Sequence, residues 1–103
     1  METSVIWTNR ALATLDNIFE FYKEKSENAA IKIVNRLYYS AGTLKTFPNA
    51  GAIEPLLDGF SVCFRSLVVE KHFKLIYYTD ENRVYITEVW DTRQNPYRLT
   101  GHL

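Results

Sequence analysis

Three short segments near the carboxyl end of the chain constrain its fold most. Residues 64–69, 73–78 and 84–90 are rich in β-branched and aromatic side chains, and a few polar residues separate each segment from the next. Segments of this composition with short connections are typical of antiparallel strands joined by tight turns. The sequence therefore predicts a three-stranded antiparallel meander over residues 64–90.

The first half of the chain predicts two helices. Apolar residues recur at steps of three and four over residues 11–22 and again over residues 30–44, which is the spacing of one apolar helical face. Thr8 or Asn9 is expected to cap the first helix, and Asn28 the second. Because the connection between them is short, we expect an antiparallel helical pair.

A short apolar run at residues 4–7 precedes the helices and predicts an edge strand. Side chains alternate between the two faces of a sheet, so one apolar face of the meander can seat the helical pair. The expected fold is α+β: a short edge strand, then an antiparallel helix pair packed on one face of a twisted antiparallel sheet. With 103 residues, the chain is expected to form a single domain over residues 1–103.

The expected turns determine which side chains share a face. Tight turns at residues 70–71 and 81–82 set the register of the two hairpins. The helix-packed face is then expected to carry Phe64, Val68, Phe73, Leu75, Tyr77, Val84 and Ile86. The open face is expected to carry Arg65, Leu67, Lys74, Ile76, Tyr78, Tyr85, Thr87 and Val89. Cations on an otherwise apolar sheet usually have an anionic partner, so we expect function on the open face.

Charge and cysteine content argue against several classes of protein. Twelve basic residues are balanced by twelve acidic ones, which counts against strong electrostatic attraction to nucleic acids. The lone Cys63 excludes an internal disulfide and a cysteine-based metal cage. The sequence has no Gly-rich phosphate loop and no metal-ligand spacing, so no metal or cofactor is expected. Without a signal peptide or a long apolar run, we expect a cytoplasmic protein that is not bound to a membrane.

Three stretches of sequence, in addition to the order of elements, point to a family. The strands contain Arg-Ser-Leu at residues 65–67 and Lys-Leu-Ile-Tyr-Tyr at residues 74–78, and Asp-Thr-Arg-Gln-Asn-Pro follows at residues 91–96. From residue 5 to about residue 99, the chain resembles the RelE/ParE superfamily, the toxin halves of bacterial type II toxin–antitoxin pairs, often labelled plasmid stabilisation proteins. The resemblance implies a compact toxin that is bound by a cognate antitoxin.

The resemblance also implies one of two activities. RelE-like members cleave mRNA on the ribosome, and ParE-like members inhibit DNA gyrase without a nuclease activity of their own. Our main hypothesis from the sequence is a ribosome-dependent, metal-independent mRNA endoribonuclease (an mRNA interferase), and the alternative is gyrase inhibition. A third reading is a family member that only binds its antitoxin.

The resemblance carries over to particular residues under the nuclease hypothesis. Lys74 and Arg93 match positions at which RelE-like ribonucleases contact the phosphate, and Arg65 supports them. His102 or Tyr97 corresponds to the carboxy-terminal proton donor of some members. RNA cleavage needs such groups, because cations stabilise the charge that builds on the phosphate and an acid protonates the leaving oxygen. The dense lysine pair of the RelE type is absent from the strand that holds Arg65.

The remaining candidates are judged from the residues themselves. Tyr78 and Tyr85 are expected on the open face, where they can stack on bases or receive an apolar side chain of an antitoxin. The alternative to a functional role is, for Lys74 and Arg93, an ordinary solvated charge. For Arg65 the alternative is a structural pair with Asp91 or a nearby carbonyl. By alternation Glu88 falls on the helix-packed face, where we expect it to pair near the sheet edge and not to act as a general base.

Overall fold

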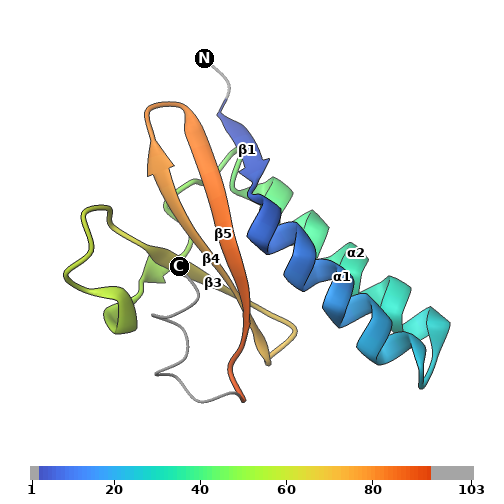
Figure 1. Ribbon diagram of the computed structural model, residues 1–103. Coiled ribbons are helices and arrows are strands. Elements are labelled where there is room, and N and C mark those ends of the chain that lie inside the picture. Colours follow the sequence, from blue (N-terminus) through green and yellow to red (C-terminus); the bar gives the residue numbers. More distant parts are fainter. Residues whose placement is uncertain (1–2, 94–103) are drawn as a thin grey trace.

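A computed structural model describes residues 3–93 (Figure 1). The elements along the chain are β1 (Ser4–Trp7), α1 (Asn9–Lys23), α2 (Glu27–Thr43), β2 (Ala52–Ile53), the short 3-10 helix η1 (Pro55–Leu57), β3 (Arg65–Val69), β4 (Phe73–Asp80) and β5 (Arg83–Asp91). They form one five-stranded sheet with the strand order β1-β5-β4-β3-β2 and a helical pair on one of its faces. The predicted α+β class is confirmed.

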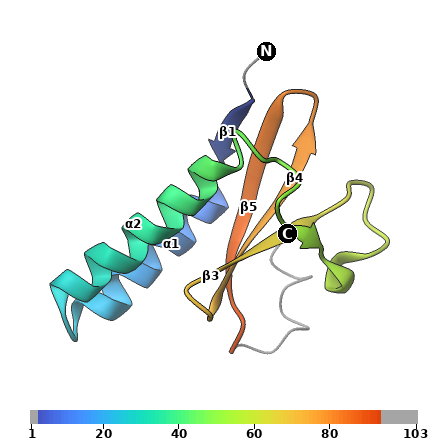
Figure 2. The same cartoon turned by 180° about the vertical axis from the view of Figure 1, so that it is seen from behind.

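β1 is the edge strand that the sequence predicts, but it runs parallel to β5. Parallel neighbours need a long crossover connection, and here α1 and α2 form the first part of it. The sheet is therefore mixed and not wholly antiparallel. The view from behind shows the helical pair on one side of the sheet and the segment 54–64 on the opposite side (Figure 2).

Side-chain oxygens set the starts of both helices. The Thr8 hydroxyl caps α1 by accepting the N–H of Ala11 at 3.3 Å. The Ser26 hydroxyl caps α2 by accepting the N–H of Ala29 at 3.2 Å. Thr8 was one of the two expected caps. The prediction that Asn28 caps α2 was wrong, because the helix begins earlier and Ser26, two residues before Asn28, supplies the capping oxygen.

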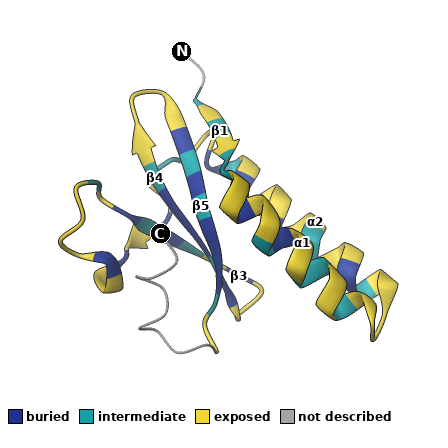
Figure 3. Ribbon diagram, viewed as in Figure 1, coloured by how far each residue is buried: buried dark blue, intermediate teal, exposed yellow. Residues whose placement is uncertain are grey.

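The apolar core has two parts, one on each side of the sheet. Most positions of β4 and β5 between these parts are buried (Figure 3). The larger part lies between the helices and the sheet and contains Ala11, Leu15, Leu37, Ala41, Leu44, Val69, Phe73, Leu75, Tyr77, Val84, Ile86 and Val89. The smaller part lies on the open face beneath the segment 54–64 and contains Leu57, Phe64, Ile76 and Trp90. The segment 54–64 therefore covers part of the open face.

The β3–β4 hairpin differs from the predicted register by one residue. Its turn has three residues (70–72) in place of two, so Arg65 pairs with Tyr77, whereas the expected two-residue turn at 70–71 would pair it with Ile76. A slip of one residue moves every side chain of a strand to the other face. Contrary to the prediction, the helix-packed face receives Arg65 and Leu67, and the open face receives Phe64 and Val68.

A β-bulge shifts the register of β5. The pairing with β4 moves by one residue between Ile86 and Glu88, which leaves Thr87 without a residue opposite. After the bulge, Val89 belongs to the core beneath the helices and Trp90 to the core on the open face. The prediction that Val89 lies on the open face was therefore wrong.

Candidate functional site

The three cations proposed to hold a phosphate do not converge. Arg65 lies opposite Tyr77 on the helix-packed face, whereas Lys74 lies opposite Val68 on the open face. Arg93 follows β5 and contacts α1. The prediction that these cations share one face was wrong, because the longer turn at residues 70–72 reverses the direction of every β3 side chain.

Lys74 is paired with a buried carboxylate. Its Nζ donates to Oε1 of Glu54 at 2.8 Å, and Glu54 is only 2% exposed. Oε2 of the same carboxylate accepts the N–H of Leu56 at 3.2 Å. Burial raises the pKa of Glu54, but the hydrogen bonds from Lys74, Leu56 and Ser66 and the charge of Lys74 outweigh it and hold the pKa below its usual value. Lys74 therefore anchors the segment that follows β2.

Arg65 fixes the backbone before β2. Its Nη1 donates to the carbonyl of Gly51 at 2.8 Å. The buried Tyr77 hydroxyl accepts the N–H of Gly51 at 2.9 Å and donates to the carbonyl of Pro48 at 2.8 Å. A Cβ at position 51 would lie 2.7 Å from the carbonyl oxygen of Ser66, so only glycine fits there. Of the two structural partners expected for Arg65, Asp91 or a nearby carbonyl, the structure shows the carbonyl.

Arg93 is held by Asp91, two residues before it. Its Nη2 donates to Oδ2 of Asp91 at 2.7 Å and its Nε donates to Oδ1 at 3.0 Å, which is a bidentate pair. Nη2 also donates to the hydroxyl of Tyr22 in α1 at 3.2 Å. The hydrogen bond from Arg93 lowers the pKa of Asp91. Of the three cations, Arg93 is the most exposed, but it too is committed to partners within the chain.

Tyr78 and Tyr85 lie on the open face as predicted, and they pair across β4 and β5, as the predicted two-residue turn at 81–82 requires. The rings of Tyr78 and Tyr85 stack with their centroids 5.0 Å apart. Phe64 packs edge-to-face with Tyr78, with the ring centroids 5.8 Å apart, and Phe60 packs edge-to-face with Phe64, with the centroids 5.6 Å apart. These rings form an aromatic row across the open face. His102 and Tyr97, the expected proton donors, lie outside the described residues.

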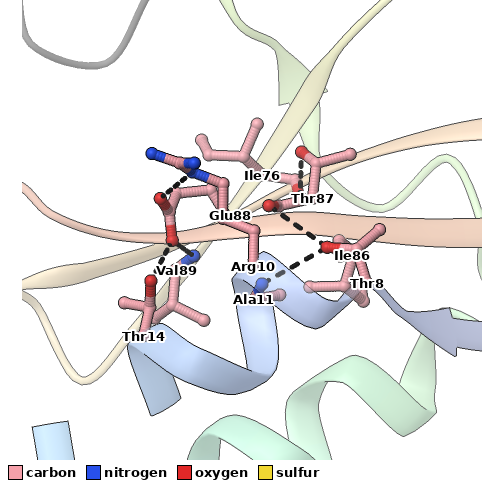
Figure 4. A network of polar contacts seen from close by, with 9 residues as sticks. All are labelled: Thr8, Arg10, Ala11, Thr14, Ile76, Ile86, Thr87, Glu88 and Val89. Carbon is pink, nitrogen blue, oxygen red and sulfur yellow. Dashed lines mark hydrogen bonds and ion pairs between the residues drawn. The ribbon is translucent and has the colours of Figure 1, made fainter. Parts of the chain in front are cut away.

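Glu88 connects β5 to α1 (Figure 4). It is only 2% exposed, and it lies on the helix-packed face as predicted. Its Oε1 accepts the hydroxyl of Thr14 at 2.5 Å and the N–H of Val89 at 2.9 Å. Its Oε2 accepts Nε of Arg10 at 3.4 Å. A charged side chain thus joins the sheet to the first helix inside the protein.

A groove between α1 and β5 was not predicted from the sequence. The helical pair and β5 diverge away from β1 (Figure 1), and about 360 Å³ of space opens between them. Glu88 bridges to Thr14 at one end of the groove, and Arg93 bridges to Tyr22 at the other. The one sequence feature that could have indicated this groove is the acidic residue at position 88 within an apolar strand. The groove itself depends on the angle between helix and sheet, which no pattern encodes.

The ion pair of Lys74 predicts a pH-dependent stability. An unfolded Glu has a pKa of about 4.3, and the pKa of Glu54 is lower in the folded state. The pair therefore contributes fully above the unfolded pKa, and its contribution is lost as the pH falls through the folded pKa. We expect the wild type to be more stable than Glu54→Gln near neutral pH, with a difference that shrinks below about pH 4. Urea unfolding of both proteins from neutral pH to below about pH 4 measures this difference in stability. A difference that does not change with pH would contradict the prediction.

The geometry can now be compared with known proteins. Residues 5–96 match the family described as "ParE toxin of type II toxin-antitoxin system, parDE". A solved structure titled "Chromosomal ParDE TA system from P. aeruginosa" superposes with a TM-score of 0.72 and 24% sequence identity, covering 86% of this chain and 95% of that chain. At this identity the likeness shows the fold alone. No curated protein matches the sequence.

A helical pair on one face of a five-stranded mixed sheet and a family match over most of the chain define a toxin of a type II toxin–antitoxin system. Within that class, the chain belongs to the ParE toxin family. Membership implies a cognate antitoxin as a binding partner. Within residues 3–93, neither helix has the length and hydropathy that crossing a membrane requires.

Proposed function

We propose that this toxin acts on DNA gyrase and has no nuclease activity of its own. The observation that carries the proposal is the match to the ParE family over residues 5–96. The alternative hypothesis from the sequence thereby gains more support than the main one. The same proposal places the toxin in the cytoplasm, where gyrase and DNA are found.

The positions of the cations support the proposal. A ribonuclease of the RelE type needs cations that can approach one scissile phosphate together. Lys74 donates to a buried carboxylate on the open face, and Arg65 donates to a main-chain carbonyl near the helix-packed face. Moving either cation to a phosphate would leave a buried polar group without its partner, which is costly.

The aromatic row on the open face is the surface that we propose for contact with the target. Tyr78 and Tyr85 are partly exposed and are held rigidly by stacking on each other. Aromatic side chains with a polar hydroxyl are enriched in protein interfaces, because they bury a large area at a small entropic cost. The sequence predicts that these two residues stack on bases or receive an apolar side chain of an antitoxin, and the same properties suit a protein target.

Two assays on the purified toxin test the proposal. We expect it to block supercoiling of relaxed plasmid by DNA gyrase and to leave mRNA intact in a translation extract. Arg93→Ala should retain gyrase inhibition if Arg93 only joins Asp91 to Tyr22. Cleavage of mRNA that Arg93→Ala abolishes would overturn the proposal and restore the nuclease hypothesis. Activity in neither assay would also overturn it and would favour a member that only binds its antitoxin.

A further inference from the structure

We propose that two copies of this toxin pair through the outer edges of their β1 strands, antiparallel and about a two-fold axis at Ile6. The two sheets then form one continuous sheet. The proposal rests on the main-chain geometry of β1 and on the side chains beside this strand, and it does not depend on gyrase as the target.

The first argument is the unpaired outer edge of β1. Within residues 3–93, β1 pairs with β5 on one side and with no strand on the other, and Figure 1 shows β1 at this end of the sheet. Proteins usually protect such an edge with a charge, a proline or a bulge. β1 has none of these, and residues 3–9 are all uncharged. The strand is therefore a template for another strand.

The second argument is the direction of the main-chain groups. At the ends of β1, the N–H groups of Ser4 and Thr8 donate to carbonyls on the β5 side at 2.8 Å and 3.1 Å. Ser4 and Thr8 thus face β5, and so does Ile6, because main-chain groups alternate in direction along a strand. The N–H and carbonyl groups of Val5 and Trp7 therefore face away from the sheet, toward a partner.

An edge with this pattern is complementary to itself. When two β1 strands lie antiparallel with Ile6 opposite Ile6, Val5 of one copy lies opposite Trp7 of the other. The two residues of such a pair exchange both N–H to carbonyl hydrogen bonds, and the two-fold axis generates the pair twice. A second copy of the same chain thus satisfies every main-chain group that β1 directs outward.

The side chains beside this edge also suit a second copy. Ile6 is 37% exposed, and at the axis its Cβ lies about 4.5–5.5 Å from that of its counterpart. On the helix-packed side, Tyr38 stacks on Trp7 with the ring centroids 5.3 Å apart and is 56% exposed. Because residues 3–9 carry no charge, pairing brings no like charges from this stretch together.

The size of the interface sets its strength. β1 has four residues, so the paired edge is roughly 13 Å long at about 3.3 Å per residue. An interface of this length is at the small end of specific interfaces, so we expect association that depends on concentration in the micromolar range. The interface uses the β1 edge of both copies, and the assembly therefore stops at a dimer.

The axis also places the open faces of the two copies on the same side. It exchanges two antiparallel strands of one sheet without turning either sheet over, so both helical pairs lie on the opposite side. Ile6 pairs in register with Tyr85, which stacks on Tyr78. The aromatic rows of the two copies thereby meet across Ile6 and form one surface.

Sedimentation equilibrium of the full-length toxin without antitoxin tests whether the dimer forms. From about 1 μM to about 500 μM, we expect the measured mass to rise from that of one chain toward twice that value. The mass of a single chain at every concentration would overturn the proposal.

Residue-resolved hydrogen exchange by NMR over the same concentrations tests where the copies meet. We expect exchange of the Val5 and Trp7 amides to slow by at least about tenfold as the dimer forms, because hydrogen bonds then protect them. The Ile6 amide faces β5 and should already be protected in the single chain. A dimer in which exchange at Val5 and Trp7 is unchanged would use another surface and would overturn the proposal.

A matched pair of proline variants tests the main-chain bonds. Val5→Pro removes an N–H that faces away from β5, so the single chain keeps its own pairing and the dimer loses bonds. Ile53→Pro makes the same change in β2, where the N–H of Glu54 donates to the carbonyl of Phe64 and that of Ile53 faces outward. Self-association should weaken at least about tenfold for Val5→Pro and stay within about twofold for Ile53→Pro. Equal effects would overturn the proposal.

A second pair keeps the proposal testable should Val5→Pro fail to fold. Ile6→Lys places two like charges opposite each other at the axis, and Ile31→Lys makes the same change on α2, where Ile31 is 43% exposed. We expect at least about tenfold weaker self-association for Ile6→Lys and a change within about twofold for Ile31→Lys. Circular dichroism verifies that both variants fold. A folded Ile6→Lys variant that associates like the wild type would overturn the proposal.

Discussion

Replacing Lys74 with methionine is expected to lower the free energy of unfolding by about 3–5 kcal/mol. The variant leaves the Glu54 carboxylate in a site that is 2% exposed, without the Nζ that lies 2.8 Å from it. Breaking a buried pair from one side is costly because the remaining charge has lost both its partner and its hydration. Urea unfolding at neutral pH measures the loss.

Two further variants isolate the cause of that loss. Lys71→Met makes the same change at an exposed position in the β3–β4 turn and should cost no more than about 0.5 kcal/mol. The double variant Glu54→Leu/Lys74→Met removes both charges and should recover most of the lost stability. If Lys74→Met were as harmless as Lys71→Met, Lys74 would not anchor the segment after β2, and a functional role for it would regain support.

Replacing Glu88 with alanine is the second change with a large expected effect. It removes the acceptor for the Thr14 hydroxyl and the Val89 N–H and leaves a small cavity between α1 and β5. Each buried donor without a partner costs about 1–3 kcal/mol, so we expect a total loss of about 3 kcal/mol. For a domain of this size, thermal unfolding should then shift downward by roughly 10–20 °C.

Glu88→Gln is the matched control, because it keeps an acceptor oxygen and removes the charge. We expect it to cost about 1 kcal/mol, since Arg10 is half-exposed and can turn to water. If the glutamine and alanine variants lost the same stability, the charge pair with Arg10 would dominate and the hydrogen bonds to Thr14 and Val89 would matter little.

Local patterns were sufficient to predict the elements of the fold. The recurrence of apolar residues identified both helices, and β-branched segments identified β1, β3, β4 and β5. β2 was not predicted, because two residues carry no periodicity. The parallel direction of β1 was not predicted either, because strand order depends on the crossover and not on the strand's own sequence.

The candidate site was less predictable because it depends on two irregularities. The β3–β4 turn holds Glu70 and Lys71 at positive φ, 52° and 68°, a conformation that is uncommon for these residue types and that no glycine signals. The bulge at Thr87 likewise could not be predicted, because no glycine in β5 indicates it. One additional residue in either place moves the side chains of the adjoining strand to the other face of the sheet. The partner of Lys74 was equally hidden, because Glu54 comes from an irregular segment.

The pairing of β1 with β5 has a consequence for synthesis of the toxin. Ser4 pairs with Arg83, so 79 residues must be made before the first strand meets its neighbour. At about 5–20 residues per second, this delay is roughly 4–16 s, during which the helical hairpin can form from local contacts alone. A nascent or truncated polypeptide that stops before β5 lacks the strand that joins β1 to β4. The sheet is therefore completed only after β5 has been synthesised.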